Sequence, residues 1–196
     1  MGAEAVAIAP GPACRWTPAI GVPAGVLVFL LSDWLEADML RHMLIEFPLL
    51  LVAGAAIADA IPRRLGELID RCNLLGLAGF ALASITMAYW MIPSALDAAL
   101  LHGPAQAAKY AGFVASGALL TRSFRAAPLA LQAFFVGNVG WMMATAGIIY
   151  QNTPQQLCVN YLVGTQSVAG EGLVAAAIII ACAWCARAVP ALLHDT

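Results

Sequence analysis

Charged side chains are scarce in this sequence. Asp, Glu, Lys and Arg together make up 10% of its 196 residues, whereas a soluble domain usually carries about 25%. Hydrophobic residues make up 62%, so the chain has too little polar surface to cover a globule in water. The composition therefore excludes an ordinary soluble domain and predicts a membrane protein.

Other absences narrow the class further. The formal net charge is −2, so nothing suggests a nucleic-acid partner. No segment alternates apolar and polar residues as a half-buried strand does, so strands do not compete with helices. The N-terminal "MGAEAVAIAPGPACRW" lacks the basic start and compact apolar core of a signal peptide. We therefore expect residues 1–16 to remain as a cytoplasmic tail.

Long apolar runs dominate the rest of the chain. A helix that crosses a bilayer needs about 20 mainly apolar residues, and several such windows are separated by charged clusters, prolines or polar runs. The expected spans are residues 17–35, 41–62, 72–93, 108–121 (a short one, which could start near Gln106), 128–150 and 161–186. The predicted fold is an all-α, polytopic transmembrane bundle of about six helices over residues 17–187, followed by a cytoplasmic tail at 188–196.

Basic residues orient this bundle, because Arg and Lys accumulate in cytoplasmic loops. If both termini are cytoplasmic, the basic residues on that side are Arg15, Arg63, Arg64, Arg71, Arg122, Arg125 and Arg187. Only Arg41 and Lys109 then lie on the outer side. The bias agrees with an even number of spans, and it places most potential metal-binding residues outside the cytoplasm.

The segment "RHMLIEFPLLLVAGAAI", residues 41–57, carries titratable residues at the start of an apolar run. If Asp38 caps this helix, the residues that share one stripe at i, i+3, i+4 and i+7 are Met39, His42, Met43 and Glu46. A carboxylate at the centre of a membrane helix costs about 3 kcal/mol. We therefore expect Glu46 to face the bundle and to have a partner there.

Two interpretations of the stripe stay open. In the first, His42 and Glu46 pair with each other, or with Arg41 and lipid headgroups. In the second, they are metal ligands. Imidazole combined with a methionine thioether suits copper, whereas imidazole and carboxylate alone also suit zinc or iron. Pro48 removes one backbone donor from the next turn, and such a loosened turn fits a site.

Two further stretches reach the same side of the membrane. "AYWMIPSALDAALLHG", residues 88–103, follows the third expected span, and "QQLCVNYLVGTQSVAGEGL", residues 155–173, enters the sixth. An intramembrane carboxylate such as Glu171 suggests a functional site, although a hydrogen bond to Gln166, Asn138 or Tyr161 would be purely structural. The candidate metal ligands are His42, Glu46, Met91, Asp97, His102 and Glu171, with Met39, Met43 and Gln166 as weaker candidates.

Small residues recur inside the expected helices and permit close helix contact. They include the pairs Gly112 and Ser116, and Gly137 and Gly140. Cys182 and Cys185 have the C-x-x-C spacing of a redox or metal pair, but they lie inside an apolar helical run. We interpret them as small residues buried in helix packing. Cys14 follows "GPA" in the tail, where no lipoprotein signal precedes it.

At three stretches the chain resembles the CtaG-type cytochrome c oxidase assembly factors of bacterial membranes. "HMLIEFPLLLVAG" is similar to the family's histidine-rich start and the apolar "PLLxxG" run that follows it. "YWMIPSALDAALLHG" is similar to the family's "WHxPxxxDAAL" segment. Gln166, Ala169 and Gly170 are similar to its "Q-x-x-G" entry to a late helix. Glu46 and Met91 stand where the family has histidines.

The resemblance implies a metallochaperone rather than an enzyme. Such a protein handles copper on the outer side of the bacterial inner membrane, for delivery to a terminal oxidase of the respiratory chain. The expected cofactor is a copper ion, with zinc or no metal as the alternatives. The expected partners are the lipid bilayer and oxidase subunits.

Other functions stay open beside this one. The chain could be an accessory transmembrane subunit of a respiratory or other oxidising complex, in which the same residues pair internally or line a water path. It could also be a small proton-coupled transporter with Glu46 and Glu171 as proton sites, but no clear inverted repeat supports that function. A membrane metalloenzyme is the remaining class.

The predicted orientation can be tested with reporter fusions. Fusions at Arg122 and at Gln155 should report opposite sides of the membrane, with Arg122 in the cytoplasm, because the basic residues accumulate on that side. Two fusions on the same side would contradict the six-span topology.

Overall fold

The computed structural model describes the backbone of residues 18–194, and most side chains from residue 23 onwards. The expected N-terminal tail, Cys14 and the side chain of His194 lie outside the described residues. Within the described range every regular element is a helix. The predicted all-helical class is therefore confirmed.

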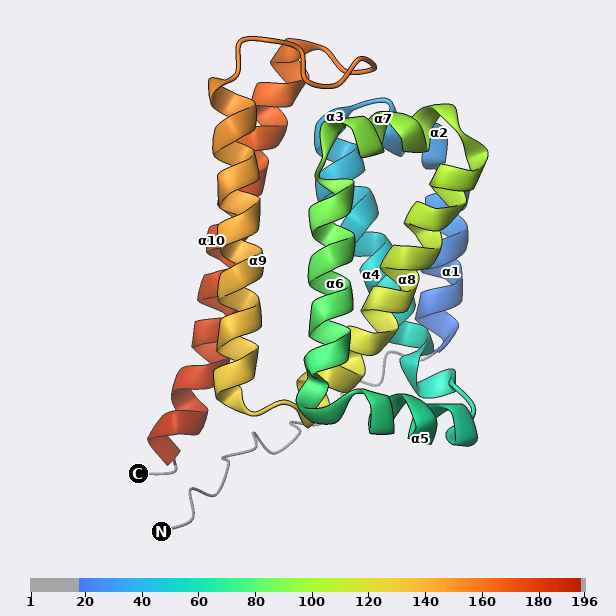
Figure 1. Cartoon of the computed structure of the whole chain (residues 1–196), viewed down its shortest axis with the longest axis vertical. Coiled ribbons are helices and arrows are strands. Elements are labelled where there is room, and N and C mark those ends of the chain that lie inside the picture. Colours follow the sequence, from blue (N-terminus) through green and yellow to red (C-terminus); the bar gives the residue numbers. More distant parts are fainter. Residues whose placement is uncertain (1–17, 195–196) are drawn as a thin grey trace.

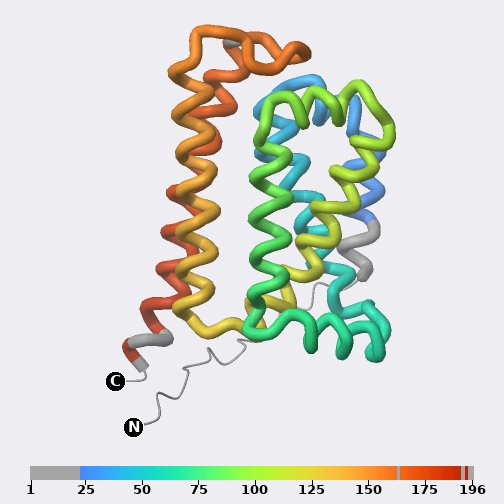
Figure 2. Tube along the Cα trace, viewed as in Figure 1, coloured from blue at the N-terminus to red at the C-terminus, as the bar shows by residue number. Residues whose placement is uncertain are grey.

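The longer helices run roughly along one axis (Figures 1 and 2). They are α1 (Pro18–Leu30), α4 (Phe47–Ile57), α6 (Leu77–Trp90), α8 (Gly103–Ala126), α9 (Leu129–Asn152) and α10 (Val163–His194). Two shorter helices lie across the ends of the bundle: α5 (Arg63–Cys72) at one end and α7 (Pro93–Leu101) at the other (Figure 1). We call these the α5 end and the α7 end.

Short helical pieces connect these elements. They are α2 (Ser32–Glu36), α3 (Met39–Arg41), the π-helical turn η1 (His42–Glu46), and the 3₁₀ turns η2 (Ala58–Ala60) and η3 (Leu74–Gly76). Elements α3, η1, α4 and η2 follow one another without a break, so the expected span 41–62 is one helical segment, Met39–Ala60.

Three described helical segments are long and apolar enough to cross a membrane: Met39–Ala60, Leu129–Asn152 and Gly164–Pro190. A fourth candidate joins α5 to η3 and α6 across a 67° bend. Helix α8 is long enough, at 24 residues, but Lys109, Arg122 and Arg125 make it more polar than these segments. The chain is therefore a helical membrane protein with three to four candidate spans among the described residues.

Large apolar side chains cover the outside of the bundle. Phe134 is 75% exposed and Trp141 is 76% exposed, and both lie on α9. A soluble monomer rarely exposes contiguous apolar patches of this kind, whereas a helix that faces lipid must. The exposed surface therefore agrees with a lipid environment.

Glycines set the closest helix contacts. A Cβ atom on Gly54 of α4 would lie 2.0 Å from the Val114 carbonyl oxygen of α8, and one on Gly117 would lie 2.1 Å from the Leu51 carbonyl oxygen. Helices α4 and α8 therefore touch backbone to backbone. On another face of α8, the Ser116 hydroxyl donates to Thr86 of α6 over 3.2 Å. The expected close contact at Ser116 is thus confirmed.

Gly137 and Gly140, which the sequence marks as able to pack closely, do not make a close helix contact. No atom of a neighbouring element lies within 4 Å of a Cβ built on Gly137, and Gly140 makes only ordinary contact with α10. Helices α9 and α10 instead cross closely at Gly147 and Gly170, where an added Cβ would lie 2.5 Å from the opposite carbonyl oxygen. Spacing within one helix does not reveal which glycines face a neighbour.

The glycine contacts give a stability prediction. Gly54→Ala should lower the melting temperature in detergent, because the new methyl meets backbone that cannot move aside, and overpacking of this kind costs about 1–3 kcal/mol. Gly137→Ala is the matched control, since it adds the same methyl in open space and favours the helix. A Gly54→Ala variant as stable as Gly137→Ala would contradict the α4–α8 contact.

Candidate functional site

The candidate site begins at the predicted helix cap. The Asp38 carboxylate accepts hydrogen bonds from the backbone N–H groups of Leu40 (2.9 Å) and Arg41 (3.4 Å). The next turn, His42–Glu46, is π-helical. Pro48 lacks the N–H that would bond to the Leu44 carbonyl in an α-helix, and π-helical turns inside α-helices are frequent at functional sites. The cap and the loosened turn are both as the sequence predicts.

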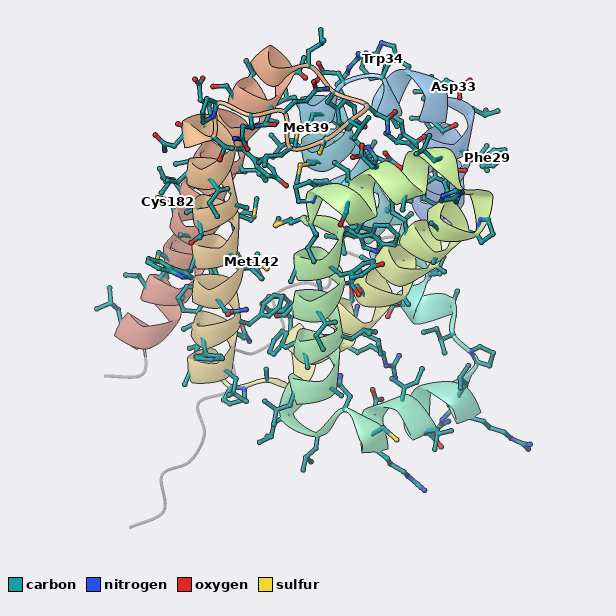
Figure 3. The ribbon with its side chains drawn as sticks, turned by 45° about the horizontal axis from the view of Figure 1, so that its top comes forward. Phe29, Asp33, Trp34, Met39, Met142 and Cys182 are labelled. Atoms are coloured by element: carbon teal, nitrogen blue, oxygen red, sulfur yellow. The ribbon has the colours of Figure 1, made fainter. Side chains whose placement is uncertain are left out.

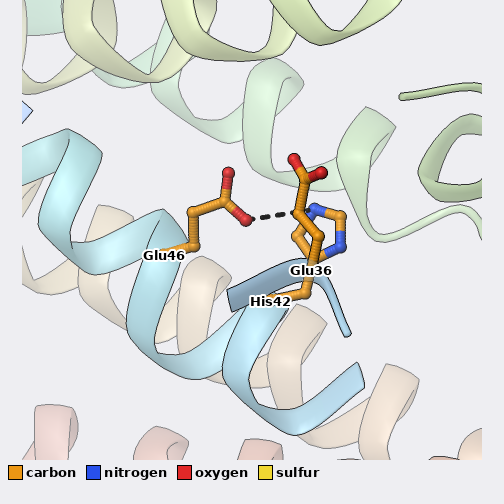
Figure 4. A group of neighbouring side chains, drawn as sticks. All are labelled: Glu36, His42 and Glu46. Carbon is orange, nitrogen blue, oxygen red and sulfur yellow. Dashed lines mark ion pairs between the residues drawn. The ribbon is translucent and has the colours of Figure 1, made fainter. Parts of the chain in front are cut away.

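The π-helical turn points His42 and Glu46 into the bundle. Both side chains are fully buried, and His42 Nε2 lies 3.5 Å from Glu46 Oε2 (Figure 4). Glu36, at the end of α2, brings a second carboxylate to the same place (Figure 4). One donor atom from each of these three residues lies within 4.8 Å of the others. The inward direction expected for Glu46 is therefore confirmed.

Lys109 of α8 completes the cluster. Its Nζ lies 2.7 Å from Glu36 Oε1, 2.7 Å from Glu46 Oε1 and 2.9 Å from His42 Nε2. The ammonium is fully buried and contacts the three donor atoms that a metal ion would use. Burying a lone ammonium is very costly, so these contacts are a condition for Lys109 to lie inside the bundle.

Lys109 and Tyr161 together determine which ring nitrogen of His42 carries the proton. The Lys109 ammonium has only donors, so His42 Nε2 must accept, and the proton of the neutral ring is on Nδ1. Nδ1 lies 2.6 Å from the Tyr161 hydroxyl, which itself donates to the Glu36 carbonyl over 2.9 Å. The Nε2 lone pair of His42 thus faces the Lys109 ammonium beside Glu46, and its other ring nitrogen is held by a partner, as in many metal sites.

The Glu46 carboxylate is paired in charge but incompletely hydrogen-bonded. Both of its oxygens are buried and lack a well-aligned hydrogen-bond donor, despite the Lys109 ammonium at 2.7 Å. Buried polar atoms of this kind are rare in folded proteins and call for an explanation. They leave acceptor capacity for a further cation or water.

Glu36 connects the cluster to the surface. Its side chain is 11% exposed, whereas those of Glu46 and Lys109 are not exposed at all. The Gln106 amide donates to both Glu36 oxygens, at 3.1 and 3.3 Å. Entry of an ion to the cluster would therefore pass Glu36.

Glu36 and Lys109 are not among the candidate ligands that the sequence predicts. In the sequence, Lys109 stands out only as one of the two basic residues on the predicted outer side. The usable signal was a lone lysine inside an apolar helix, because intramembrane ionisable residues need partners. Arg41, considered as a partner for the stripe, instead lies over the Trp34 ring at 4.4 Å.

Asp97 and Gln166 hold a loop rather than join the cluster. The Asp97 carboxylate accepts from the backbone N–H groups of Val159 (2.9 Å) and Asn160 (3.3 Å). The Gln166 side-chain oxygen accepts from Leu157 N over 2.9 Å. Together they fasten the α9–α10 loop to α7 and α10, and this loop carries Tyr161. Their contribution to the site is therefore to position Tyr161.

The remaining candidates lie outside the cluster. His102 is exposed at the junction of α7 and α8, and Glu171 is exposed on α10. Met39 and Met43 are buried in the apolar core. Met91 lines an open apolar groove of about 360 Å³ between α6 and α9. Of the six main candidate ligands, the structure brings together His42 and Glu46.

Three further sulfur-containing side chains lie outside the cluster, one on α9 and two on α10. Met142 lies on the side of α9 that faces α6 (Figure 3) and lines the same mainly apolar groove as Met91. Cys182 (Figure 3) and also Cys185 are exposed on α10, so their interpretation as buried packing residues is wrong. Helix rotation turns both thiols away from the bundle.

Cys158 is a poor metal ligand as it stands. The thiol is buried in the α9–α10 loop, and burial together with the nearby Asp97 charge raises its pKa to about 12. Metals bind the thiolate, which is scarce at neutral pH for such a group. Cys158 therefore belongs to the packing of the loop.

No protein-family model, no curated protein and no solved structure matches the chain.

The Tyr161 contacts give a prediction. Tyr161→Phe removes the acceptor of the buried His42 Nδ1–H and the donor to the Glu36 carbonyl. Leaving a buried donor unsatisfied costs about 1–3 kcal/mol, so the melting temperature in detergent should fall. Tyr89→Phe is the matched control, because Tyr89 is half exposed. Equal melting temperatures for the two variants would contradict the His42–Tyr161 contact.

Proposed function

We propose that this chain is a membrane metal-handling protein that binds a divalent transition metal at Glu36, His42 and Glu46 and passes it to a respiratory oxidase. The observation that carries the proposal is the gathering of three potential ligand atoms within 4.8 Å inside an apolar bundle. An intramembrane cluster of this kind is costly and is a functional site by default.

The charge of the cluster favours a divalent ion. With both carboxylates ionised and His42 neutral, two negative charges face the single positive charge of Lys109. A divalent ion bound by Glu36, His42 and Glu46 would balance the two carboxylates, once the ammonium has moved away. The flexible four-carbon stem of lysine permits such a movement. Lys109 thus holds the place of the metal cargo.

The donor types limit the choice of metal. One imidazole and two carboxylates suit copper(II) and zinc. Copper is the first choice, because the chain resembles the CtaG-type assembly factors at the segments that carry His42, Asp97 and Gln166. Delivery to oxidase subunits rests on the same likeness.

The proposal includes six spans with both termini in the cytoplasm of a bacterial inner membrane. Helices α1 and α8 would be the spans beyond the three candidates and the bent pair that ends in α6. The α7 end would then face outwards, which agrees with the concentration of arginines in and beside α5 and with the positive-inside rule. Metal would reach Glu36 from the outer side of the inner membrane.

The accessory-subunit function is the second candidate, and one observation favours it. Lys109 already neutralises part of the cluster through contacts of 2.7–2.9 Å, so the ion network could serve only to join helices. A structural network and a metal site differ in what the removal of Lys109 does to metal affinity.

Lys109→Met is therefore the decisive variant. Without metal it should lower the free energy of unfolding by about 3–5 kcal/mol, because it leaves buried carboxylates unpaired. If the cluster takes a metal, the same variant should bind copper(II) or zinc about tenfold more tightly, since the competing cation is gone. Calorimetric titration of detergent-purified protein, together with melts with and without metal, measures both effects.

The controls separate the cluster from general charge effects. Arg41→Met removes one positive charge outside the cluster and should leave metal affinity unchanged. Glu46→Gln keeps the side-chain shape and should weaken binding, whereas Glu171→Gln should not. If neither wild type nor Lys109→Met binds copper or zinc, the metal-handling proposal fails and the accessory-subunit function takes its place.

A further inference from the structure

The α5 helix lies across the end of the bundle opposite the metal cluster (Figures 1 and 2). It follows the segment Met39–Ala60 and precedes α6, and the chain bends by 67° between α5 and the η3–α6 segment. A left-handed turn at Leu75 and Gly76, with φ of 53° and 77°, makes this bend. Because apolar helices adjoin it on both sides, α5 is tethered near the membrane surface.

The ten residues of α5 divide into two faces. At about 100° per residue, the apolar residues fall within one arc of about 100°: Leu65, Leu68, Ile69 and Cys72. The charged residues fill the opposite arc: Arg63, Arg64, Glu67, Asp70 and Arg71. A helix with such faces and little overall hydrophobicity is typical of one that lies in the membrane interface.

The apolar face of α5 is not used to pack on the bundle. Gly66 faces Arg122, where an added Cβ would lie 3.0 Å from a guanidinium nitrogen, and Asp70 accepts from Arg122 at 2.6 and 2.8 Å. Leu65 is 49% exposed and Leu68 is 57% exposed. The contact with the bundle therefore lies to one side of the apolar arc, where Ile69 is half-buried, and leaves Leu65, Leu68 and Cys72 exposed.

Two arginines of α5 lack an acidic partner among the described residues. Arg63 pairs with Glu67 at 2.9 Å, and Asp70 is taken by Arg122, whose hydrogen bonds hold the pKa of that carboxyl below its usual range. Arg64 and Arg71 have no such pair in the described part of the chain. On the helical wheel both flank the apolar arc, on the side away from the bundle contact.

We propose that α5 is an in-plane helix that binds anionic lipid headgroups of the leaflet at the α5 end. Leu65, Leu68 and Cys72 enter the boundary of the acyl chains. Arg64 and Arg71, beside them, pair with lipid phosphates, for which guanidinium geometry is well suited. The proposal uses no residue of the metal cluster and does not depend on it.

Cys72 provides a probe of depth at the centre of the apolar face. In a full-length variant with the other cysteines replaced by serine, a fluorophore on Cys72 in nanodiscs should be quenched strongly by nitroxide attached near the top of the acyl chains. The matched control moves the single cysteine to position 67 on the charged face (Cys72→Ser with Glu67→Cys). The label at position 67 should be quenched at least about twofold less than the label on Cys72. Equal quenching at the two positions would overturn the in-plane placement.

The wild-type chain gives a second measurement in case the cysteine variants fail to fold. Modification of Cys72 by a water-soluble maleimide, followed by mass spectrometry of peptides, should be slower in nanodiscs than in short-chain detergent solution. The exposed Cys182 and Cys185 serve as internal references for lipid-facing thiols. Fast modification of Cys72 in nanodiscs would also overturn the placement.

The headgroup preference needs its own comparison. Replacing part of the phosphatidylcholine in the nanodisc with phosphatidylglycerol should move the Cys72 label deeper into the bilayer and so increase its quenching. The reason is that basic side chains are attracted to anionic surfaces. Arg64→Gln with Arg71→Gln should abolish this change, whereas Arg63→Gln with Glu67→Gln should retain it. If millimolar glycerol phosphate abolishes the change, the site binds soluble anions and the lipid assignment is overturned. If the change persists in Arg64→Gln with Arg71→Gln, the lipid assignment is overturned as well.

Discussion

The contacts of one ammonium group hold the α7 end of this protein together. Lys109 Nζ meets two carboxylates and an imidazole at 2.7–2.9 Å in a part of the bundle where its side chain is fully buried. Neither the ammonium nor the carboxylates could be buried alone, because each would carry the full cost of desolvation. The cluster is therefore stable only as a unit, and the elements that supply it must meet.

Those elements come from distant parts of the chain. Glu36 ends α2, His42 and Glu46 belong to η1, and Lys109 lies in the second turn of α8. Tyr161 adds the α9–α10 loop through its contacts with His42 and the Glu36 carbonyl. Asp97 and Gln166 hold the loop that carries Tyr161. The polar residues of this end thus form two connected layers: an ionic centre and a hydrogen-bonded loop that closes over it.

The opposite end uses charge differently. Its ion pairs join Arg122 to Asp70 and Arg125 to Asp59, and these side chains are far more exposed than the Lys109 cluster. Exposed pairs contribute little to stability, so the packing of this end depends more on the close approach of glycines, as at Gly76 and Gly79 against Ser123. A buried cluster at one end and a solvated, basic surface at the other suit a protein whose chemistry lies on one side of a membrane.

The sequence by itself determined the helical membrane class, the Asp38 cap, the loosened turn before Pro48, and the common stripe of His42 and Glu46. Each of these follows from local composition or from spacing within one helix. Only the tertiary structure decided that Lys109, 67 residues beyond His42, is the partner of the stripe, and that Asp97 and Gln166 bind a loop. It also turned His102, Glu171 and Cys182 outwards. The reason is physical. A buried charge needs a partner, and the rotation and register of the packed helices select that partner. The apolar contacts that set this rotation and register leave no periodic signal in the sequence.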